Sequence, residues 1–131
     1  MSAQEVVEAL HDALGRADRE AVSALLHPAV RWIFPRGFPG AQEHRGKAAV
    51  EQYLFASNRP QGAVFQTRID SVHEDDDLVF VRGAFVVKIH SQGLDMAVPA
   101  VFVFEVRGGL IENCHLFTDT ITINDALLGR L

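Results

Sequence analysis

The chain has 131 residues, of which 48 % are hydrophobic and 22 % charged, and its formal net charge at pH 7 is −5. These values are ordinary for a globular protein, and we expect a single domain over residues 1–131. The diffuse negative charge argues against sequence-independent binding to nucleic acid or to an anionic membrane. The lone cysteine, Cys114, excludes an internal disulfide. With no secretory signal and no membrane-spanning stretch, we expect a cytoplasmic protein.

The first half of the chain has helical periodicity. Ser2 and Glu5 have the spacing of a capping box, and apolar residues follow at helical intervals at Val6, Val7, Leu10, Leu14 and Ala17. Asp18 is placed to cap a second short helix that Pro28 ends. A third helix is predicted from about Lys47 to Ser57.

A short strand and a loop separate the second and third helices. Val30, Trp32 and Phe34 alternate on one face of the strand. The segment Pro35 to Gly40 contains two prolines and two glycines, which indicates a loop.

The second half of the chain has the alternation typical of strands. Val64 to His73 is predicted as one strand, and Glu74 to Asp77 as an acidic turn. The next strand, Leu78 to His90, has apolar residues at its odd positions, Val79, Val81, Phe85, Val87 and Ile89. A strand from about Leu94 to Arg107 follows, and Asn124 is placed to cap a short terminal helix.

The hairpin around Gly108-Gly109 organises the predicted sheet. Its first strand is apolar on both faces, which indicates a central strand. Its second strand has two rows. One contains Ile111, Asn113, His115, Phe117 and Asp119, and the other contains Leu110, Glu112, Cys114, Leu116 and Thr118. The first row either faces solvent or lines a pocket, and the pattern alone does not distinguish these.

This order of elements predicts an α+β domain in which three N-terminal helices pack on one face of a curved antiparallel sheet. A sheet folded over helices encloses a cavity. Because the opposite face is also apolar in its central strand, we expect a homodimer formed through the sheet.

Three segments of the chain are similar to the nuclear transport factor 2-like superfamily, in particular its SnoaL-like branch. They are Leu25 to Pro35, Gly46 to Tyr53, and Gly109 to Ile111 followed by Asp119. The resemblance implies a cone-shaped, cystatin-like α+β roll. It leaves the activity open, because the superfamily contains isomerases, hydrolases, cyclases, dehydratases and non-catalytic binders.

The chain departs from several chemistries of that superfamily. Phe34 stands where ketosteroid isomerases have their catalytic carboxylate, and Val98 or Pro99 where they have a buried acid. Limonene epoxide hydrolases have an Arg and an Asp two residues apart, where this chain has Arg82 and Ala84. Phenazine-biosynthesis relatives have a last-strand glutamate at a position held here by Leu116.

The resemblance to SnoaL-like polyketide cyclases implies a catalytic role for Asp119, which matches their acid or base by position. A carboxylate in an apolar cavity has a raised pKa, which suits general acid-base catalysis. The alternative is that Asp119 only hydrogen-bonds to backbone where the chain leaves the strand. His115, on the same face, is the second catalytic candidate, and otherwise an ordinary satisfied histidine.

Further residues are candidates for binding a hydrophobic small-molecule ligand. They are Asn113, Trp32, Phe34, Tyr53 and Phe117. Each has a structural alternative, in the core for the aromatic residues and at the surface for the amide. No metal site is expected, because His27, His44, His73 and His90 lack ligand spacing, and no cofactor is expected. Two functions remain open: a cofactor-independent isomerase, cyclase or dehydratase, or a non-catalytic binding or accessory protein.

Overall fold

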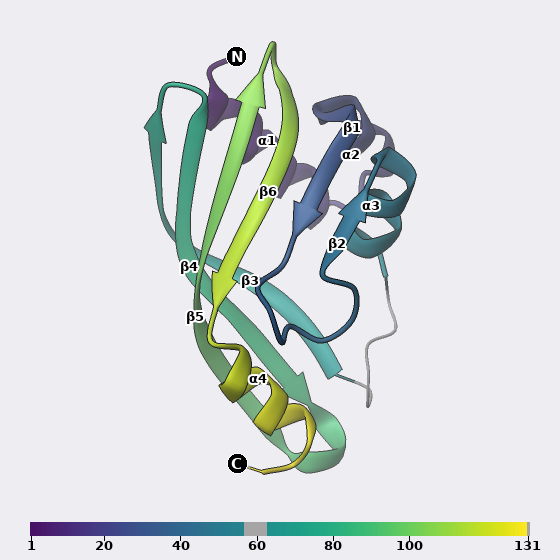
Figure 1. Cartoon of the computed structure of the whole chain (residues 1–131), viewed down its shortest axis with the longest axis vertical. Coiled ribbons are helices and arrows are strands. Elements are labelled where there is room, and N and C mark those ends of the chain that lie inside the picture. Colours follow the sequence, from purple (N-terminus) through teal and green to yellow (C-terminus); the bar gives the residue numbers. More distant parts are fainter. Residues whose placement is uncertain (57–62, 131) are drawn as a thin grey trace.

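The computed structural model describes residues 1–56 and 63–130. The helices are α1 (Ala3–Gly15), α2 (Arg19–Leu25), α3 (Lys47–Leu54) and α4 (Thr120–Leu127), with a 3₁₀ turn at His90–Gln92. The strands are β1 (Leu26–Ile33), β2 (Glu43–Arg45), β3 (Ala63–Asp75), β4 (Leu78–Ile89), β5 (Leu94–Arg107) and β6 (Leu110–Thr118). The strands form one curved sheet, and α1 crosses behind it (Figure 1). This arrangement confirms the predicted α+β class.

The sheet has the strand order β2-β1-β6-β5-β4-β3. All neighbouring strands are antiparallel except β1 and β6, which are parallel. The expected antiparallel arrangement is therefore found in four of the five pairings of the described strands, and the parallel pairing of β1 with β6 makes the sheet mixed. The cause is that the chain leaves β1, forms α3 and the long β3–β5 meander, and returns as β6 beside β1 in the same direction.

Three predicted elements change at their ends. The third helix ends at Leu54, and Ser57 lies outside the described residues. The terminal helix begins at Thr120 with Asp119 as its N-cap, so Asn124 is inside the helix and is not its cap. The strand β3 continues through Asp75, so the predicted acidic turn contains only its last two residues. Strand β2 was not predicted, because three residues are too few to show an alternation.

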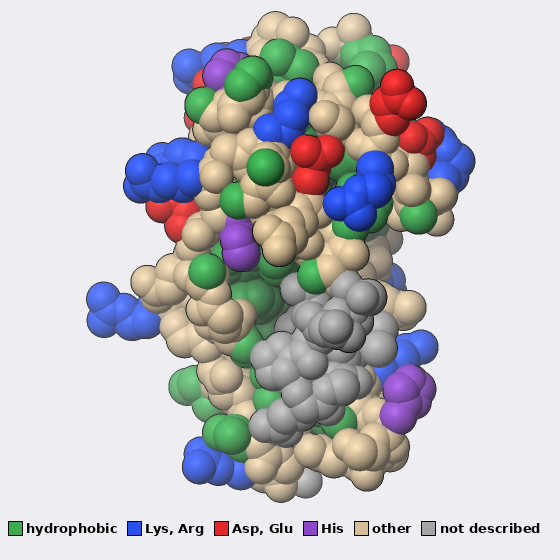
Figure 2. Space-filling view, turned by 90° about the vertical axis from the view of Figure 1, so that its right-hand side faces the viewer, with side chains coloured by type: hydrophobic (Ala, Val, Ile, Leu, Met, Phe, Trp, Pro, Cys, Tyr) green, Lys and Arg blue, Asp and Glu red, His purple; other side chains and the backbone are tan. Residues whose placement is uncertain are grey.

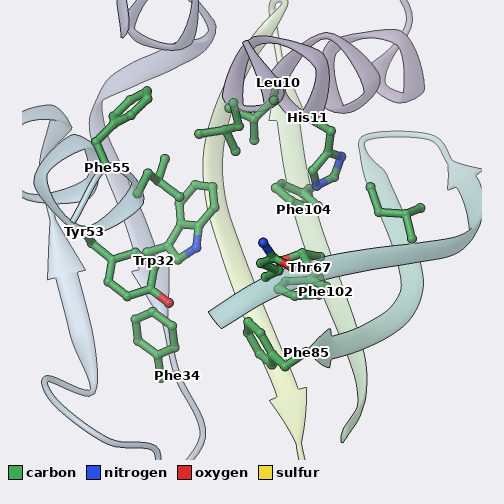
Figure 3. A pocket seen from close by; sticks show the side chains of 15 residues that line it. Leu10, His11, Trp32, Phe34, Tyr53, Phe55, Thr67, Phe85, Phe102 and Phe104 are labelled. Carbon is green, nitrogen blue, oxygen red and sulfur yellow. The ribbon is translucent and has the colours of Figure 1, made fainter. Parts of the chain in front are cut away.

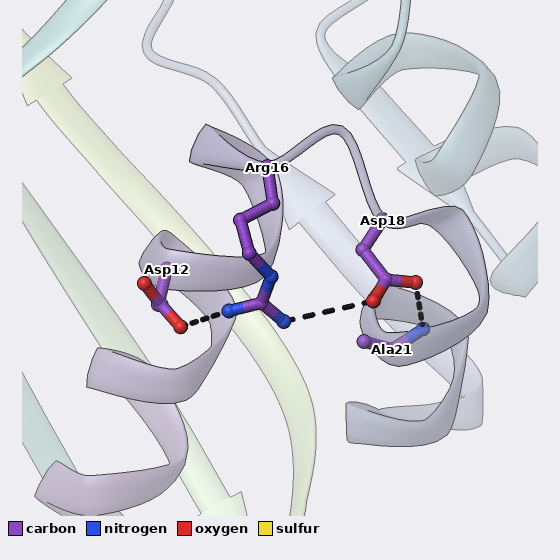
Figure 4. A network of polar contacts seen from close by, with 4 residues as sticks. All are labelled: Asp12, Arg16, Asp18 and Ala21. Atoms are coloured by element: carbon purple, nitrogen blue, oxygen red, sulfur yellow. Dashed lines mark hydrogen bonds and ion pairs between the residues drawn. The ribbon is translucent and has the colours of Figure 1, made fainter.

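The helix starts follow the predicted capping chemistry. Ser2 and Glu5 form a capping box at α1, and the carboxylate of Asp18 accepts a hydrogen bond from the backbone of Ala21 at 3.0 Å. Figure 4 shows that Arg16 lies between Asp12 and Asp18, and its ion pair with Asp18 measures 3.6 Å. These ion pairs are exposed and contribute little to stability, whereas the caps define where α1 and α2 begin.

The strand β4 packs its predicted apolar row against the helices. Val79, Val81, Phe85, Val87 and Ile89 are all buried. Their partners in β5 are buried as well, including Phe104 opposite Val79 and Phe102 opposite Val81. The inner face of the sheet therefore forms one core with α1, as alternation predicts.

A β-bulge divides the residue rows of β6. Glu105 pairs with Asn113, but the next residue, Val106, pairs with Ile111, so Glu112 is extra. The bulge turns Ile111 to the inner face, where it is fully buried. The predicted grouping of Ile111 with Asn113 is therefore wrong.

The close approach of β3 and β4 depends on Gly83 in β4. A Cβ atom at this position would lie 1.8 Å from the carbonyl oxygen of Arg68 in β3. The β3–β4 register shifts just beyond Ile69, the partner of Gly83. Only a residue without a side chain permits this approach of the two strands beside the bulge.

We expect Gly83→Ala to lower the free energy of unfolding by about 3 kcal/mol, because backbone must move to admit the methyl group. Gly15→Ala is the matched control, since a Cβ there meets nothing within 4 Å. It should leave stability unchanged or raise it by up to about 1 kcal/mol. Urea denaturation of both variants tests this, and equal stabilities would contradict the role given to Gly83.

Candidate functional site

A cavity of about 470 Å³ lies between the helices and the inner face of the sheet (Figure 3). Its walls come from α1, β1, α3, β3, β4 and β5. Most of the lining side chains are aromatic or aliphatic. The polar ones are His11, Tyr53, Gln66 and Thr67, besides the indole of Trp32. A cavity of this size and character is typical of a small-molecule site.

The predicted aromatic residues on β1, directly after it and on α3 line this cavity. Trp32, Phe34 and Tyr53 are all among the lining residues. The rings of Phe34 and Tyr53 are 4.9 Å apart between centroids in an edge-on arrangement, and Tyr53 also stacks on His44 at 4.9 Å. Their place in the cavity agrees with the sequence analysis, and their contact with a substrate stays a prediction.

Phe104 connects the two sides of the cavity. Its ring meets Trp32 edge-on at 5.8 Å and His11 edge-on at 5.9 Å. Trp32 and Phe104 come together because both pair with Cys114, from β1 and β5 respectively, and so lie in one row across the sheet. Phe104 is almost fully buried, which fixes the two rings that it contacts.

His11 lines the cavity and has a strongly lowered pKa, but the sequence analysis did not single it out. His11 lies four residues after Val7 and three before Leu14, on the apolar side of α1. Burial lowers the pKa of His11 to about 4, because desolvation disfavours the imidazolium, while a hydrogen bond to the Val7 backbone opposes the shift. The signal was present, since a histidine at helical spacing among buried residues faces the same side as they do.

Asp119 does not lie in the cavity. It is exposed at the end of β6, and one oxygen accepts a hydrogen bond from the backbone of Thr122 at 3.0 Å. The hydroxyl of Thr122 donates to the other oxygen at 2.6 Å. These bonds lower the pKa of Asp119, so the expectation of a raised pKa in an apolar pocket is wrong. The carboxylate caps α4, because an N-cap must satisfy the free N–H groups of the first turn.

The row of β6 that contains His115 faces away from the helices. Asn113 and His115 are half-buried, and Phe117 is 48 % exposed. The rings of His115 and Phe117 lie 4.4 Å apart on this outer face. None of the three lines the cavity. The open choice between pocket and surface is therefore settled in favour of the outer face, and their roles as catalytic or binding residues stay untested.

Charge is absent from the walls of the cavity, since none of its described lining residues is Asp, Glu, Lys or Arg. Charged side chains lie outside, and on the face in Figure 2 acidic and basic ones are interspersed above a region of exposed apolar side chains. Among residues 1–56 and 63–130, no cluster of three or more His, Cys, Asp or Glu is placed to hold a metal ion.

Two further findings concern the reactivity of the Cys114 thiol and the length of the helices. Burial raises the pKa of the Cys114 thiol, which keeps it protonated and unreactive. Within the described part of the chain, no helix has both the length and the apolar character needed to cross a bilayer.

Comparison with known proteins identifies the family. The family model of the SnoaL-like domain matches residues 7–113, which is most of the chain. No curated protein matches the sequence.

Solved structures with the same fold are numerous, and three are informative. An NTF2-like protein from Burkholderia xenovorans LB400 has 22 % identity and a TM-score of 0.82, over 95 % of each chain. TerC, co-crystallised with polyporic acid, has 21 % identity and a TM-score of 0.79, over 96 % of this chain and 98 % of TerC. An LEH-like epoxide hydrolase from M. tuberculosis has 23 % identity and a TM-score of 0.73, over 97 % of this chain and 90 % of the hydrolase. At these identities the similarity shows the NTF2-like fold and leaves the activity open.

The pKa of His11 predicts a pH-dependent stability. Between about pH 6.5 and pH 4 the unfolded chain binds a proton at His11 that the folded chain does not. The stability that the protein has with a neutral His11 is therefore complete above pH 6.5, and it is lost as the pH falls toward 4. Between pH 7 and pH 4, the free energy of unfolding of the native protein should fall by about 3 kcal/mol more than that of His11→Gln.

Urea denaturation at a series of pH values measures this difference. His73→Gln is the control, since His73 is exposed on β3. It should keep the pH dependence of the native protein. A native-like pH dependence in His11→Gln would show that His11 is not desolvated in the folded state.

Proposed function

We propose that this chain, which belongs to the SnoaL-like domain family, binds a hydrophobic, oxygenated small molecule in the cavity between its helices and sheet. The observation that carries the proposal is a cavity of about 470 Å³ with aromatic walls and a few separate polar groups. Such walls bind apolar surface by its removal from water, while the polar groups orient the ligand.

The polar groups of the cavity favour a ligand without charge. A carboxylate or ammonium group inside would be desolvated with no described lining residue of opposite charge to pair with it. Hydroxyl, carbonyl or ether groups instead find partners in the side chains of His11, Tyr53 and Thr67.

The sequence left two functions open, a cofactor-independent enzyme and a non-catalytic binding protein. Binding in which Asp119 plays no catalytic part has the better support. Proton transfer requires an acid or base within hydrogen-bonding reach of the substrate. Asp119 is instead outside the cavity, with both carboxylate oxygens engaged by Thr122. An isomerase, cyclase or dehydratase reaction in this cavity would need another acid-base residue, and of the described lining residues only His11 is a histidine.

The solved relatives are compatible with this proposal. TerC was co-crystallised with polyporic acid, and another relative is described as an epoxide hydrolase. Both resemble this chain in fold over nearly its full length. They support a search for a ligand in the cavity, without naming it.

Binding of 2-naphthol tests the proposal, with the fluorescence of Trp32 as the signal. Trp32 is the only tryptophan of the chain and lines the cavity. We expect saturable quenching with the native protein. Leu14→Phe should weaken binding at least about tenfold, because the larger side chain takes up cavity volume.

Leu128→Phe is the matched control, since it makes the same change at an exposed residue at the C-terminal end of α4, outside the cavity lining. Asp119→Ala should also leave binding unchanged while lowering the unfolding temperature through loss of the α4 cap. Quenching that does not saturate, or that Leu14→Phe leaves unaltered, would refute a binding site in the cavity.

We also propose that two copies associate through their outer sheet faces. Strand pairing places Phe80, Val103 and His115 in one row, with Arg82, Val101 and Phe117 in the next. Phe80, Val101 and Phe117 are each more than one-third exposed. Arg82 lies at one end of this patch and Glu105 at the other, so a two-fold pairing that exchanges the ends brings opposite charges together.

Sedimentation velocity measures this association. The native protein should sediment as a dimer, and Phe117→Lys as a monomer, because the ammonium group would be buried in the apolar patch. Ile121→Lys changes an exposed apolar residue of α4 outside the patch and should remain dimeric. A native protein that still sediments as a monomer at about 100 µM would contradict this proposal.

A further inference from the structure

His11 occupies a place in the cavity that structural packing alone does not require. It lies on the apolar side of α1, one turn before Leu14, and its ring sits edge-on to Phe104 at 5.9 Å. Figure 3 shows the imidazole reaching from α1 toward the cavity, beside Phe104 and above Thr67. A leucine or phenylalanine would fill the same volume without the cost of desolvating two ring nitrogens.

One ring nitrogen of the His11 imidazole remains available as a hydrogen-bond acceptor. A neutral imidazole carries one N–H donor and one unprotonated nitrogen. The N–H donates to the backbone carbonyl of Val7, one turn earlier in α1. The second nitrogen is therefore a hydrogen-bond acceptor, held in place by the ring contact with Phe104.

The opposite wall supplies a donor. Figure 3 shows the indole nitrogen of Trp32 pointing into the cavity from β1. Because an indole has only a donor, it suits a carbonyl or ether oxygen of a ligand and cannot accept from a hydroxyl group. The acceptor on His11 and the donor on Trp32 thus make different demands on a ligand, from two sides of Phe104.

We propose that His11 accepts a hydrogen bond from a hydroxyl group of the ligand, so that the cavity selects uncharged phenol- or enol-type molecules over hydrocarbons and ethers of the same size. This inference rests on the proposed function and assigns the residue that gives it chemical selectivity. The selectivity arises because a bound ligand without a donor covers the ring nitrogen, displaces its water and leaves it without a hydrogen bond, which is costly. Since His11 stays neutral, no proton needs to leave the site when the ligand enters.

Three probes of similar size separate the contribution of a hydroxyl donor to binding from those of an oxygen without a donor and of the apolar rings. They are 2-naphthol, which has a hydroxyl donor, 2-methoxynaphthalene, which has an oxygen but no donor, and 2-methylnaphthalene, which has neither. Each is titrated into the native protein, His11→Phe and His11→Gln at pH 7, with Trp32 fluorescence as the signal. The phenyl ring keeps the shape of the imidazole, and the glutamine amide keeps an acceptor.

The measured quantity is the ratio of the dissociation constant of 2-methylnaphthalene to that of 2-naphthol. In the native protein this ratio should be about tenfold larger than in His11→Phe, and His11→Gln should recover part of the difference. Comparing variants cancels the different hydrophobicities of the probes. Binding of 2-methylnaphthalene by His11→Phe shows that this variant still forms the cavity.

The outcomes distinguish this inference from the proposed function. Equal ratios in the native protein and His11→Phe, with all three probes bound, overturn the role of His11 and leave the binding cavity standing. Failure of the native protein to bind any probe overturns both. If His11→Phe does not fold, the native protein alone decides, because equal affinity for 2-naphthol and 2-methoxynaphthalene refutes selection for a donor.

Discussion

The packing of Phe104 positions His11 and Trp32, the two cavity residues on which the proposed ligand recognition depends. Its ring is buried in the centre of the sheet and contacts His11 on α1 and Trp32 on β1. The two neighbours therefore keep a fixed separation across a strand that neither of them belongs to. A cavity that recognises a ligand needs such fixed partners, because each rotamer that must be ordered on binding lowers the affinity.

The polar chemistry of the molecule is divided between its interior and its surface. Among the described residues the carboxylates lie outside the cavity, where Asp18 and Asp119 cap helices and Glu43 pairs with arginines. The described residues that line the cavity have neutral side chains. This division follows from desolvation, since an ion in an apolar pocket loses its hydration without a partner to replace it, whereas a neutral imidazole loses much less. The same physics that lowers the pKa of His11 therefore defines the kind of ligand that the cavity admits.

Much of the fold was predictable because its signals are local. The capping box at Ser2 and the alternation of β4 each depend on residues close in the chain, and both were found in the structure. The parallel pairing of β1 with β6 was not predictable from such signals, because it joins residues about 85 positions apart.

The candidate site was predictable only in part, through Trp32 and Phe34 on one wall and Tyr53 of α3 on another. Alternation placed Trp32 and Phe34 correctly, but the bulge at Glu112 breaks the alternation of β6, and nothing in the sequence marks it. Asp119 illustrates a different difficulty, since a carboxylate between a strand and a helix suits an N-cap as well as a catalytic acid. His11 was overlooked because a single histidine in an amphipathic helix attracts less attention than a motif, although its spacing placed it among buried residues.

Selective binding as proposed depends on a neutral ligand hydroxyl meeting His11 inside the cavity. A crystal structure of the protein soaked with 2-naphthol tests this most directly. We predict the naphthalene rings inside the cavity, against Trp32 and Phe104, with the hydroxyl oxygen about 2.7–3.2 Å from a ring nitrogen of His11. Naphthol on the outer face beside Phe117, or in the cavity with its hydroxyl group directed away from His11, would contradict the account.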